Sequence, residues 1–349
     1  MASPSDSSGD PSDPQAAVVS HREGALLVLG VAGAGRTEAL ALTCSHSPAG
    51  DLRTRAEEAA SEPFEELAVH PHRVAAVRLL REHSTEAGVD PLLESFNPAE
   101  RLAMLLDRVD ELPLRRHAIR GNAAGLLARL VGRIDALKAA AVTPERFRSW
   151  TDELTREAAD DAERDSAERE REFAELYAIH DSILFESGAT DGGSAVMELT
   201  RLLVERPALA AAISERYPHL IVDELEDACP AERELIARLA KGSRTAVLSC
   251  DDEQGRARCG SGAAWARAAL GEPAEVGFET SWRYGGELLD AAHAVLAPIS
   301  GREGTGTRRA AGPETEVAFW SAANERAEVQ AVAREVESAL AAGDLRPGR

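Results

Sequence analysis

The stretch GALLVLGVAGAGRT, residues 24–37, decides the fold. It opens with an unbroken apolar run, residues 25–29, and closes with glycines and alanines. Such a run is typical of a parallel strand that is buried on both faces, and glycines permit the tight turn that follows it. The stretch therefore predicts an α/β protein in which this strand leads into a glycine-rich loop and then a helix.

The glycine-rich part, residues 30–37, fits the phosphate-binding pattern G-x-x-x-x-G-K-[S/T] except that Arg36 replaces the lysine. In such a loop, backbone N–H groups and the next helix N-terminus bind phosphate, and the Thr37 hydroxyl can bind Mg²⁺. Arg36 keeps the positive charge, but its longer planar head does not fit the space of a lysine ammonium. A plain turn between strand and helix is the alternative. The candidate nucleotide ligands are Gly30, Ala32, Gly33, Ala34, Gly35, Arg36 and Thr37.

Two further apolar runs end in polar side chains. Asp223 and Glu224 follow the run LIV at residues 220–222, and Gln254 ends TAVLSCDDEQ at residues 245–254. Because the carboxyl ends of parallel strands meet at one edge, ligands of such sheets bind there. Asp223 is a candidate Mg²⁺ ligand, Glu224 a candidate base for an attacking water, and Gln254 a candidate γ-phosphate contact. Each alone is equally an ordinary acidic strand end or turn, but their coincidence with the glycine loop favours a nucleotide site.

A fourth candidate is Arg283, in the segment FETSWRY at residues 278–284. A positive charge there would stabilise the charge that develops during phosphoryl transfer. The alternative is an arginine that stacks on its aromatic neighbours.

Apolar residues recur at helical spacing between residues 65 and 215, where strand candidates are nearly absent. A helical domain is therefore expected to interrupt one parallel sheet. After residue 300 the sequence predicts a glycine-rich linker, a strand TEVAFWSA at residues 315–322, and a helix. The predicted divisions are a disordered tail at 1–14, the sheet domain at 15–64 and 216–300, the helical domain at 65–215, the linker at 301–312, and the start of another domain at 313–349.

The composition limits the other possibilities. The chain has 349 residues and a net charge of −21, which argues against nonspecific nucleic-acid binding over its whole surface but leaves a local groove open. No run approaches the ~20 apolar residues that span a bilayer, and the polar start has no signal-peptide pattern. The four cysteines form no Cys-x-x-Cys pair. We therefore expect a cytoplasmic protein with reduced thiols and no membrane partner.

Read in order, these segments resemble the UvrD/Rep-type superfamily 1A DNA helicases. The segment that begins DPQ at residue 13 resembles the family's opening, in which a glutamine recognises adenine; that glutamine is Gln15. VDELEDACPAE at 222–232 resembles VDEFQDTNPAQ, CDDEQ at 250–254 resembles GDDDQ, and TSWRY at 280–284 resembles QNYRS. The matches span about residues 12–340.

The resemblance implies a RecA-like P-loop NTPase sheet (domain 1A), an inserted all-helical domain (1B) and the start of a second RecA-like domain (2A). It implies ATP and Mg²⁺ as ligands and single-stranded DNA as the polymer along which the protein moves, with a role in DNA repair. A helicase or nuclease subunit is a candidate partner. By position, the glycine loop would hold the phosphates, Thr37 and Asp223 the metal, Glu224 the water, Gln254 the γ-phosphate, and Arg283 the transition-state charge.

The sequence departs from the family pattern around this site. Besides Arg36, few residues separate Thr37 from LALTCSH at residues 40–46, so either the helix after the loop or the next strand is shortened. Ala257 and Cys259 stand where the family has aromatic residues that stack on DNA bases, and each such contact is worth ~1–3 kcal/mol. Glu226 and Glu232 replace glutamines, which we expect to repel a polyphosphate.

Two readings therefore remain. The first is an ATP-dependent DNA helicase or its N-terminal ATP-binding part. The second is a degenerate helicase-like subunit that binds nucleotide or DNA weakly and acts as a scaffold. The family's motifs V and VI have no counterpart in the sequence, so we expect strand separation to require more than these residues.

Overall fold

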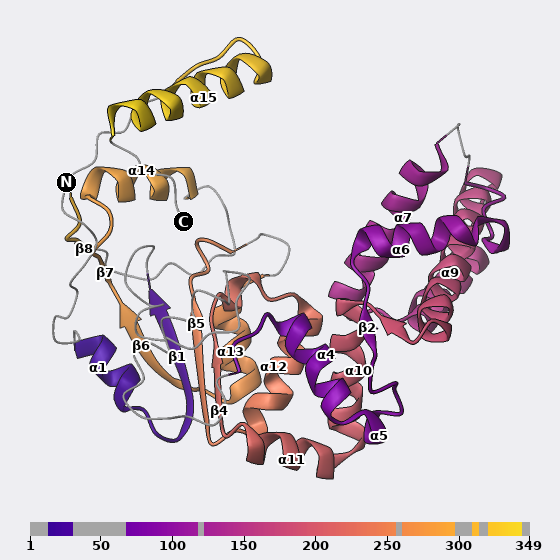
Figure 1. The fold of residues 1–349 in the computed structure, drawn as a ribbon, viewed down its shortest axis with the longest axis horizontal. Coiled ribbons are helices and arrows are strands. Elements are labelled where there is room, and N and C mark those ends of the chain that lie inside the picture. Colours follow the sequence, from indigo (N-terminus) through magenta and orange to yellow (C-terminus); the bar gives the residue numbers. More distant parts are fainter. Residues whose placement is uncertain are drawn as a thin grey trace.

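The computed structural model describes residues 13–30, 68–117, 122–255, 260–296, 309–313 and 320–343. Within these residues the centre of the fold is a parallel four-stranded sheet in the order β4-β5-β1-β6 (Figure 1). The sheet confirms the predicted α/β class. Its strands are β1 (Gly24–Gly30), β4 (His219–Val222), β5 (Thr245–Cys250) and β6 (Ala274–Phe278).

The strand register brings the carboxyl ends of all these strands to one edge. Leu29 of β1 lies opposite Cys250 of β5, and Gly30 lies opposite Phe278 of β6. Val222, the last residue of β4, lies opposite Leu248 of β5. The polar residues that follow β4 and β5 therefore emerge side by side next to the end of β1.

Alternate residues of β1 pack on opposite faces of the sheet, as strand geometry requires. Leu27 packs with residues of β4 and β5 and with helices α12 (Pro230–Gly242) and α13 (Gly262–Leu270). Leu26 and Val28 pack on the other face with Val18 of helix α1 (Asp13–Ser20). All of β5 is buried, which explains why its aliphatic residues 246–248 are consecutive rather than alternating with polar ones.

Strand β6 is not among the predicted strands. Its sequence AEVGF is largely exposed and contains a glycine, both of which weaken a strand signal. It forms because its backbone pairs with β1 from Leu26 to Gly30. An edge strand of this kind owes its structure to its neighbour rather than to its own composition.

Between β1 and β4 the described chain is mainly helical, as expected from its periodicity. Several of these helices have a side chain that caps their N-terminus. Asn97 forms a capping box with Glu100 at the start of one helix, and Thr143 accepts a hydrogen bond from the N–H of Arg146 at the start of another. The one described exception is a short parallel pair, β2 (Glu94–Ser95) with β3 (Ala189–Thr190). The helices are α4 (His72–Glu82), α5 (Ser84–Ala87), α6 (Pro98–Asp107), η1 (Val109–Glu111), α7 (Ala123–Ala139), α8 (Pro144–Glu157), α9 (Asp161–Glu186), α10 (Gly192–Glu205) and α11 (Pro207–Arg216).

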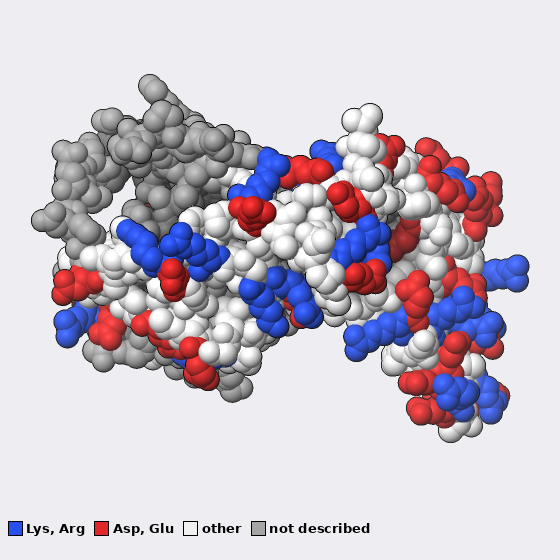
Figure 2. Space-filling model, turned by 90° about the horizontal axis from the view of Figure 1, so that it is seen from below, with Lys and Arg blue, Asp and Glu red and all other residues white. Residues whose placement is uncertain are grey.

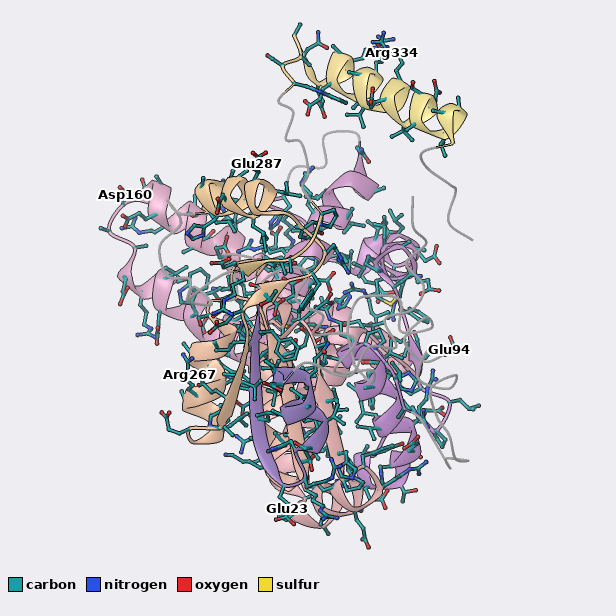
Figure 3. All side chains as sticks on the ribbon, turned by 90° about the vertical axis from the view of Figure 1, so that its left-hand side faces the viewer. Glu23, Glu94, Asp160, Arg267, Glu287 and Arg334 are labelled. Atoms are coloured by element: carbon teal, nitrogen blue, oxygen red, sulfur yellow. The ribbon has the colours of Figure 1, made fainter. Side chains whose placement is uncertain are left out.

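These helices form two apolar clusters. Helices α6 to α9 pack on one another around Leu127, Phe173 and Tyr177, and they project to the right of the sheet in Figure 1. Asp160, the N-cap of α9, lies at the outer edge of this group (Figure 3). Helices α4, α10 and α11 instead pack on α12, which follows β4. Helix α4 near the start of the predicted 65–215 insertion and helices α10 and α11 near its end are thus joined by apolar packing to α12, the helix that follows β4.

A buried ion-pair network connects the two clusters. Lys138, at the end of α7 and only 1% exposed, donates hydrogen bonds to Asp181 of α9, Asp191 and Ser194 of α10 at 2.5–2.6 Å. Asp191 also caps α10 by accepting from the N–H groups of Gly193 and Ser194. Ligand atoms of His180, Asp181 and Asp191 lie close enough to hold a metal ion, but the Lys138 ammonium already lies between the carboxylates.

Asp191 makes the network sensitive to acid. Burial opposes its ionisation, but the Lys138 charge and hydrogen bonds overcome this and lower its pKa from 3.8 to about 2. A carboxyl with a depressed pKa stabilises the fold above its unfolded pKa and loses that contribution as pH falls through the folded pKa. We expect up to about 2 kcal/mol of the free energy of unfolding to be lost between about pH 4 and pH 2 through this residue.

Chemical denaturation at pH 7 and pH 3 checks this prediction. The Asp191→Asn variant keeps a good N-cap but has no proton to bind, so its stability should change less between the two pH values than that of the wild type. Equal pH dependence in the two proteins would contradict the assignment.

The predicted linker at 301–312 contains a strand at its end. β8 (Arg309–Ala310) pairs in parallel with β7 (Thr280–Ser281), so this part of the predicted linker is paired with the segment that follows β6. A methyl group on Gly312 would overlap the backbone nitrogen of Tyr284, so this close approach requires glycine. The strand predicted at 315–322 falls mostly outside the described residues. The helix predicted after it is α15 (Glu325–Ala342), and a further helix, α14 (Gly286–Leu296), precedes the predicted linker; Arg334 of α15 and Glu287 of α14 are labelled in Figure 3.

Candidate functional site

The edge formed by the carboxyl ends of the strands gathers most of the predicted site residues that the structure describes. Asp223 follows β4 and is 6% exposed, and one of its carboxylate oxygens accepts a hydrogen bond from the Glu224 N–H at 3.0 Å. Glu224 has a left-handed backbone, with φ 55° and ψ 42°, directly before the short helix η2 (Leu225–Asp227). That conformation is uncommon for a residue other than glycine and turns the chain sharply where the strand ends.

Gln254 lies in the loop after β5, next to the end of β4. Its side-chain Nε2 donates to Asp251 Oδ2 at 2.6 Å, so the amide is folded back onto its own loop. The Gln254 backbone N–H also donates to the Asp251 carbonyl at 2.9 Å. Asp223, Glu224 and Gln254 therefore belong to neighbouring loops at one edge of the sheet, as the sequence predicted.

The glycine loop is described only at its first residue. Gly30 is the last residue of β1 and is buried between β5 and β6. Gln15 lies in α1, which packs against β6 and precedes β1. The other predicted phosphate and metal ligands, Ala32, Gly33, Ala34, Gly35, Arg36 and Thr37, lie outside the described residues.

Arg283 is not joined to this group by the described contacts of its side chain. It is exposed, follows β7, and has its guanidinium carbon 5.9 Å from the centre of the Tyr284 ring. This arrangement is the aromatic stack that the sequence offered as the alternative. A role for Arg283 in nucleotide chemistry stays a prediction.

Glu226 and Glu232, which the sequence analysis expected to repel a polyphosphate, both have structural partners within the fold. Glu226 is 5% exposed, and its Oε2 accepts from the Asp251 N–H at 2.9 Å. Glu232 accepts from the Cys229 N–H at 3.0 Å, which caps α12, and from Arg73 Nε at 2.9 Å. Burial disfavours the ionised form of Glu232, but these hydrogen bonds from Cys229 and Arg73 lower its pKa.

Glu232 should therefore matter for stability. The Glu232→Ala change removes the cap of α12 and the Arg73 partner, and we expect it to lower the free energy of unfolding by about 1–2 kcal/mol at pH 7. Glu234, on the exposed side of the same helix and paired with Arg238, provides the matched control. Glu234→Ala should cost no more than about 0.5 kcal/mol by urea denaturation, and equal losses in both variants would contradict the assignment.

Sequence reasoning also missed two buried residues that support this edge. Asp252 caps α13 by accepting from the Gly262 N–H at 2.6 Å. Arg233 of α12 is 5% exposed and reaches backbone carbonyls of both loops. Asp252 belongs to the polar segment after β5 and Arg233 lies between two glutamates, and neither pattern identifies the partners of these residues.

On the face that Figure 2 presents, the described side chains form no continuous positively charged strip. There, the described Lys and Arg side chains are interspersed with Asp and Glu. Of the helices in the described ranges, none combines the length and the apolar character needed to cross a membrane.

Comparison with known proteins finds one matching family model and several related proteins. The family model of the UvrD/REP helicase N-terminal domain matches residues 36–255, more than half of the chain. The ATP-dependent DNA helicase PcrA of Staphylococcus epidermidis is 21% identical over 354 residues, covering 92% of this chain and 45% of the relative. The DNA helicase II of Haemophilus influenzae is 22% identical over 178 residues, covering 48% of this chain and 24% of the relative. The chain thus spans about half the length, or less, of these relatives.

Proposed function

The chain belongs to the UvrD/REP helicase N-terminal domain family, and from that premise we propose that it binds ATP with Mg²⁺ at the carboxyl edge of its sheet. The observation that carries the proposal is the placement of Gly30, Asp223, Glu224 and Gln254 at the ends of adjacent parallel strands. Nucleotides bind at this edge in open parallel sheets.

The donor set fits a magnesium nucleotide. Asp223 is a buried carboxylate directly after β4, at the carboxyl edge of the sheet. Carboxylate and hydroxyl oxygens are ligands that Mg²⁺ prefers, so Asp223 and Thr37 would hold the ion. When bound, Mg²⁺ neutralises charge on the phosphate oxygens.

The protein's own groups have separate tasks in this proposal. The backbone N–H groups of residues 30–37 bind phosphate oxygens, and Arg36 contributes charge. Glu224 accepts a proton from the attacking water. The Gln254 amide leaves Asp251 and turns to the γ-phosphate. Arg283 stabilises the transition-state charge only if residues 278–284 approach the carboxyl edge of the sheet. Gln15 recognises the base.

We further propose that ATP hydrolysis is coupled to movement on single-stranded DNA, as in a helicase. The relatives are an ATP-dependent DNA helicase and a DNA helicase, which supports DNA as the polymer. In this proposal residues 15–64 and 216–300 form domain 1A, 65–215 supply domain 1B, and 313–349 begin domain 2A. The packing of α4, α10 and α11 on α12 favours a narrower 1B that consists of α6 to α9. A cytoplasmic location, a role in DNA repair and a helicase or nuclease partner belong to the same proposal.

A second candidate is a nucleotide- or DNA-binding subunit that does not hydrolyse ATP. Two observations favour it: Arg36 replaces the lysine, and the Gln254 amide is bound to Asp251. In this reading the site binds nucleotide to fix a conformation rather than to drive movement.

ATP hydrolysis measured with and without single-stranded DNA tests the proposal. We expect the wild-type chain to hydrolyse ATP faster when DNA is added, and Arg36→Lys to hydrolyse it faster than the wild type because the ammonium fits the loop. Binding of ATP without turnover in either protein would support the second candidate. No binding in either would contradict both.

A further inference from the structure

Buried contacts hold two loops of the candidate site together. We call residues 223–227 the β4 loop and residues 251–255 with 260–261 the β5 loop. The Glu226 carboxylate crosses from the first to the second and accepts the Asp251 N–H at 2.9 Å. Because Glu226 is 5% exposed, this bond is sheltered from water and ties the end of one strand to the end of the next.

Arg233 makes the second connection. Its Nη2 lies 3.4 Å from the carbonyl oxygens of Leu225 and Glu226 in the β4 loop, and 3.1 Å from that of Gly260 in the β5 loop. Its Nη1 lies 3.4 Å from the Ser261 carbonyl. A guanidinium offers five donors in a fixed plane, so one side chain can hold carbonyls of two loops at once, which a lysine ammonium does less well.

Glycines allow the loops to approach closely. A methyl group on Gly255 would lie 2.9 Å from the Glu226 Cβ. One on Gly262 would lie 2.8 Å from the Cys250 Sγ and 3.2 Å from the Glu226 backbone nitrogen. All three separations are shorter than ordinary contacts, and the one to the Glu226 nitrogen involves backbone that cannot move aside easily. The spacing between the loops is therefore set by backbone packing as well as by the two charged side chains.

We propose that Glu226 and Arg233 are positioning residues that fix the β4 loop against the β5 loop. On the basis of the proposed function, this pairing holds Glu224 and Gln254 in position around one bound nucleotide. Neither Glu226 nor Arg233 touches that nucleotide. When the Gln254 amide leaves Asp251 for a phosphate, the Glu226 bond to the Asp251 N–H transmits the movement to the β4 loop.

Hydrogen exchange of backbone amides, read by mass spectrometry, tests the pairing without requiring activity. Arg233→Met and Glu226→Leu break the two connections, whereas Glu226→Gln keeps an acceptor for the Asp251 N–H. Arg238→Met on the exposed face of α12 is the matched control. We expect exchange in residues 251–255 and 260–264 to accelerate about tenfold or more in the two broken variants, and to stay at the wild-type rate in the other two.

Steady-state ATP hydrolysis by the same four variants supplies the functional readout. Loss of positioning should lower kcat about tenfold in the two broken variants while KM for ATP stays within about twofold, with Glu226→Gln retaining wild-type kcat. Unchanged exchange in the loops, an increase spread equally over β1 and the other strands, or faster loop exchange with unchanged kcat would each overturn the inference. If the wild type shows no turnover, the proposed function fails, and the exchange pattern alone decides whether the loops are paired.

Discussion

A Glu224→Gln variant is expected to bind ATP as the wild type does but to hydrolyse it about 10²–10⁴-fold more slowly. Glutamine has nearly the same shape as glutamate, so the sharp turn with φ 55° before η2 should persist. It cannot accept a proton from water at neutral pH, and general base catalysis is lost. The measurement is single-turnover hydrolysis at saturating ATP, together with an ATP binding titration.

The same substitution at Glu234 controls for the change of charge, because Glu234 lies on the exposed face of α12. Glu234→Gln should leave both binding and hydrolysis within about twofold of the wild type. If Glu224→Gln hydrolyses ATP at the wild-type rate, the assignment of Glu224 as the base is wrong.

Loss of the Lys138 side-chain charge should produce the largest change in stability. In Lys138→Met the chain stem is replaced by an apolar one of similar length, while Asp181 and Asp191 lose the ammonium that lies 2.5–2.6 Å from their oxygens. Removal of one partner from a buried ion pair leaves an uncompensated charge and typically costs about 3–5 kcal/mol. We expect a decrease of that size in the free energy of unfolding, measured by urea denaturation at pH 7.

The chain's other lysine provides the control. Lys241 is exposed at the end of α12, so Lys241→Met should cost less than about 1 kcal/mol. Similar losses for the two lysines would show that the buried network does not join the helical clusters.

Much of the sheet could be predicted from sequence because its inner strands are buried on both faces. Residues 25–29 are apolar throughout and residues 246–248 form a shorter apolar run, and the polar residues that follow mark where each strand ends. Helical spacing likewise identified α4, α6, α7 and α10. The edge strand β6 carries no such signal, because pairing with β1 rather than burial of its own residues makes it a strand.

The placement of the candidate site residues was predictable only where it follows from their position at the end of a strand. Asp223, Glu224 and Gln254 follow strands, and parallel pairing places them at one edge. Glu226, Glu232 and Arg233 could not be interpreted, because their partners lie on other elements and their charge suggested repulsion or solvent exposure. Arg283 was chosen for its place in a motif; its described side chain lies over the Tyr284 ring, and its role in nucleotide chemistry stays a prediction.

The central claim is that the carboxyl edge of the sheet binds ATP, and an equilibrium titration with ATP and Mg²⁺ tests it most directly. The wild-type chain should bind one equivalent of ATP, and Asp223→Ala should weaken binding in the presence of Mg²⁺ by about tenfold or more because the metal loses a carboxylate. Binding measured with the metal chelated should differ little between the two proteins. No ATP binding by the wild type, or equal Mg²⁺-dependent affinity in both proteins, would contradict the account.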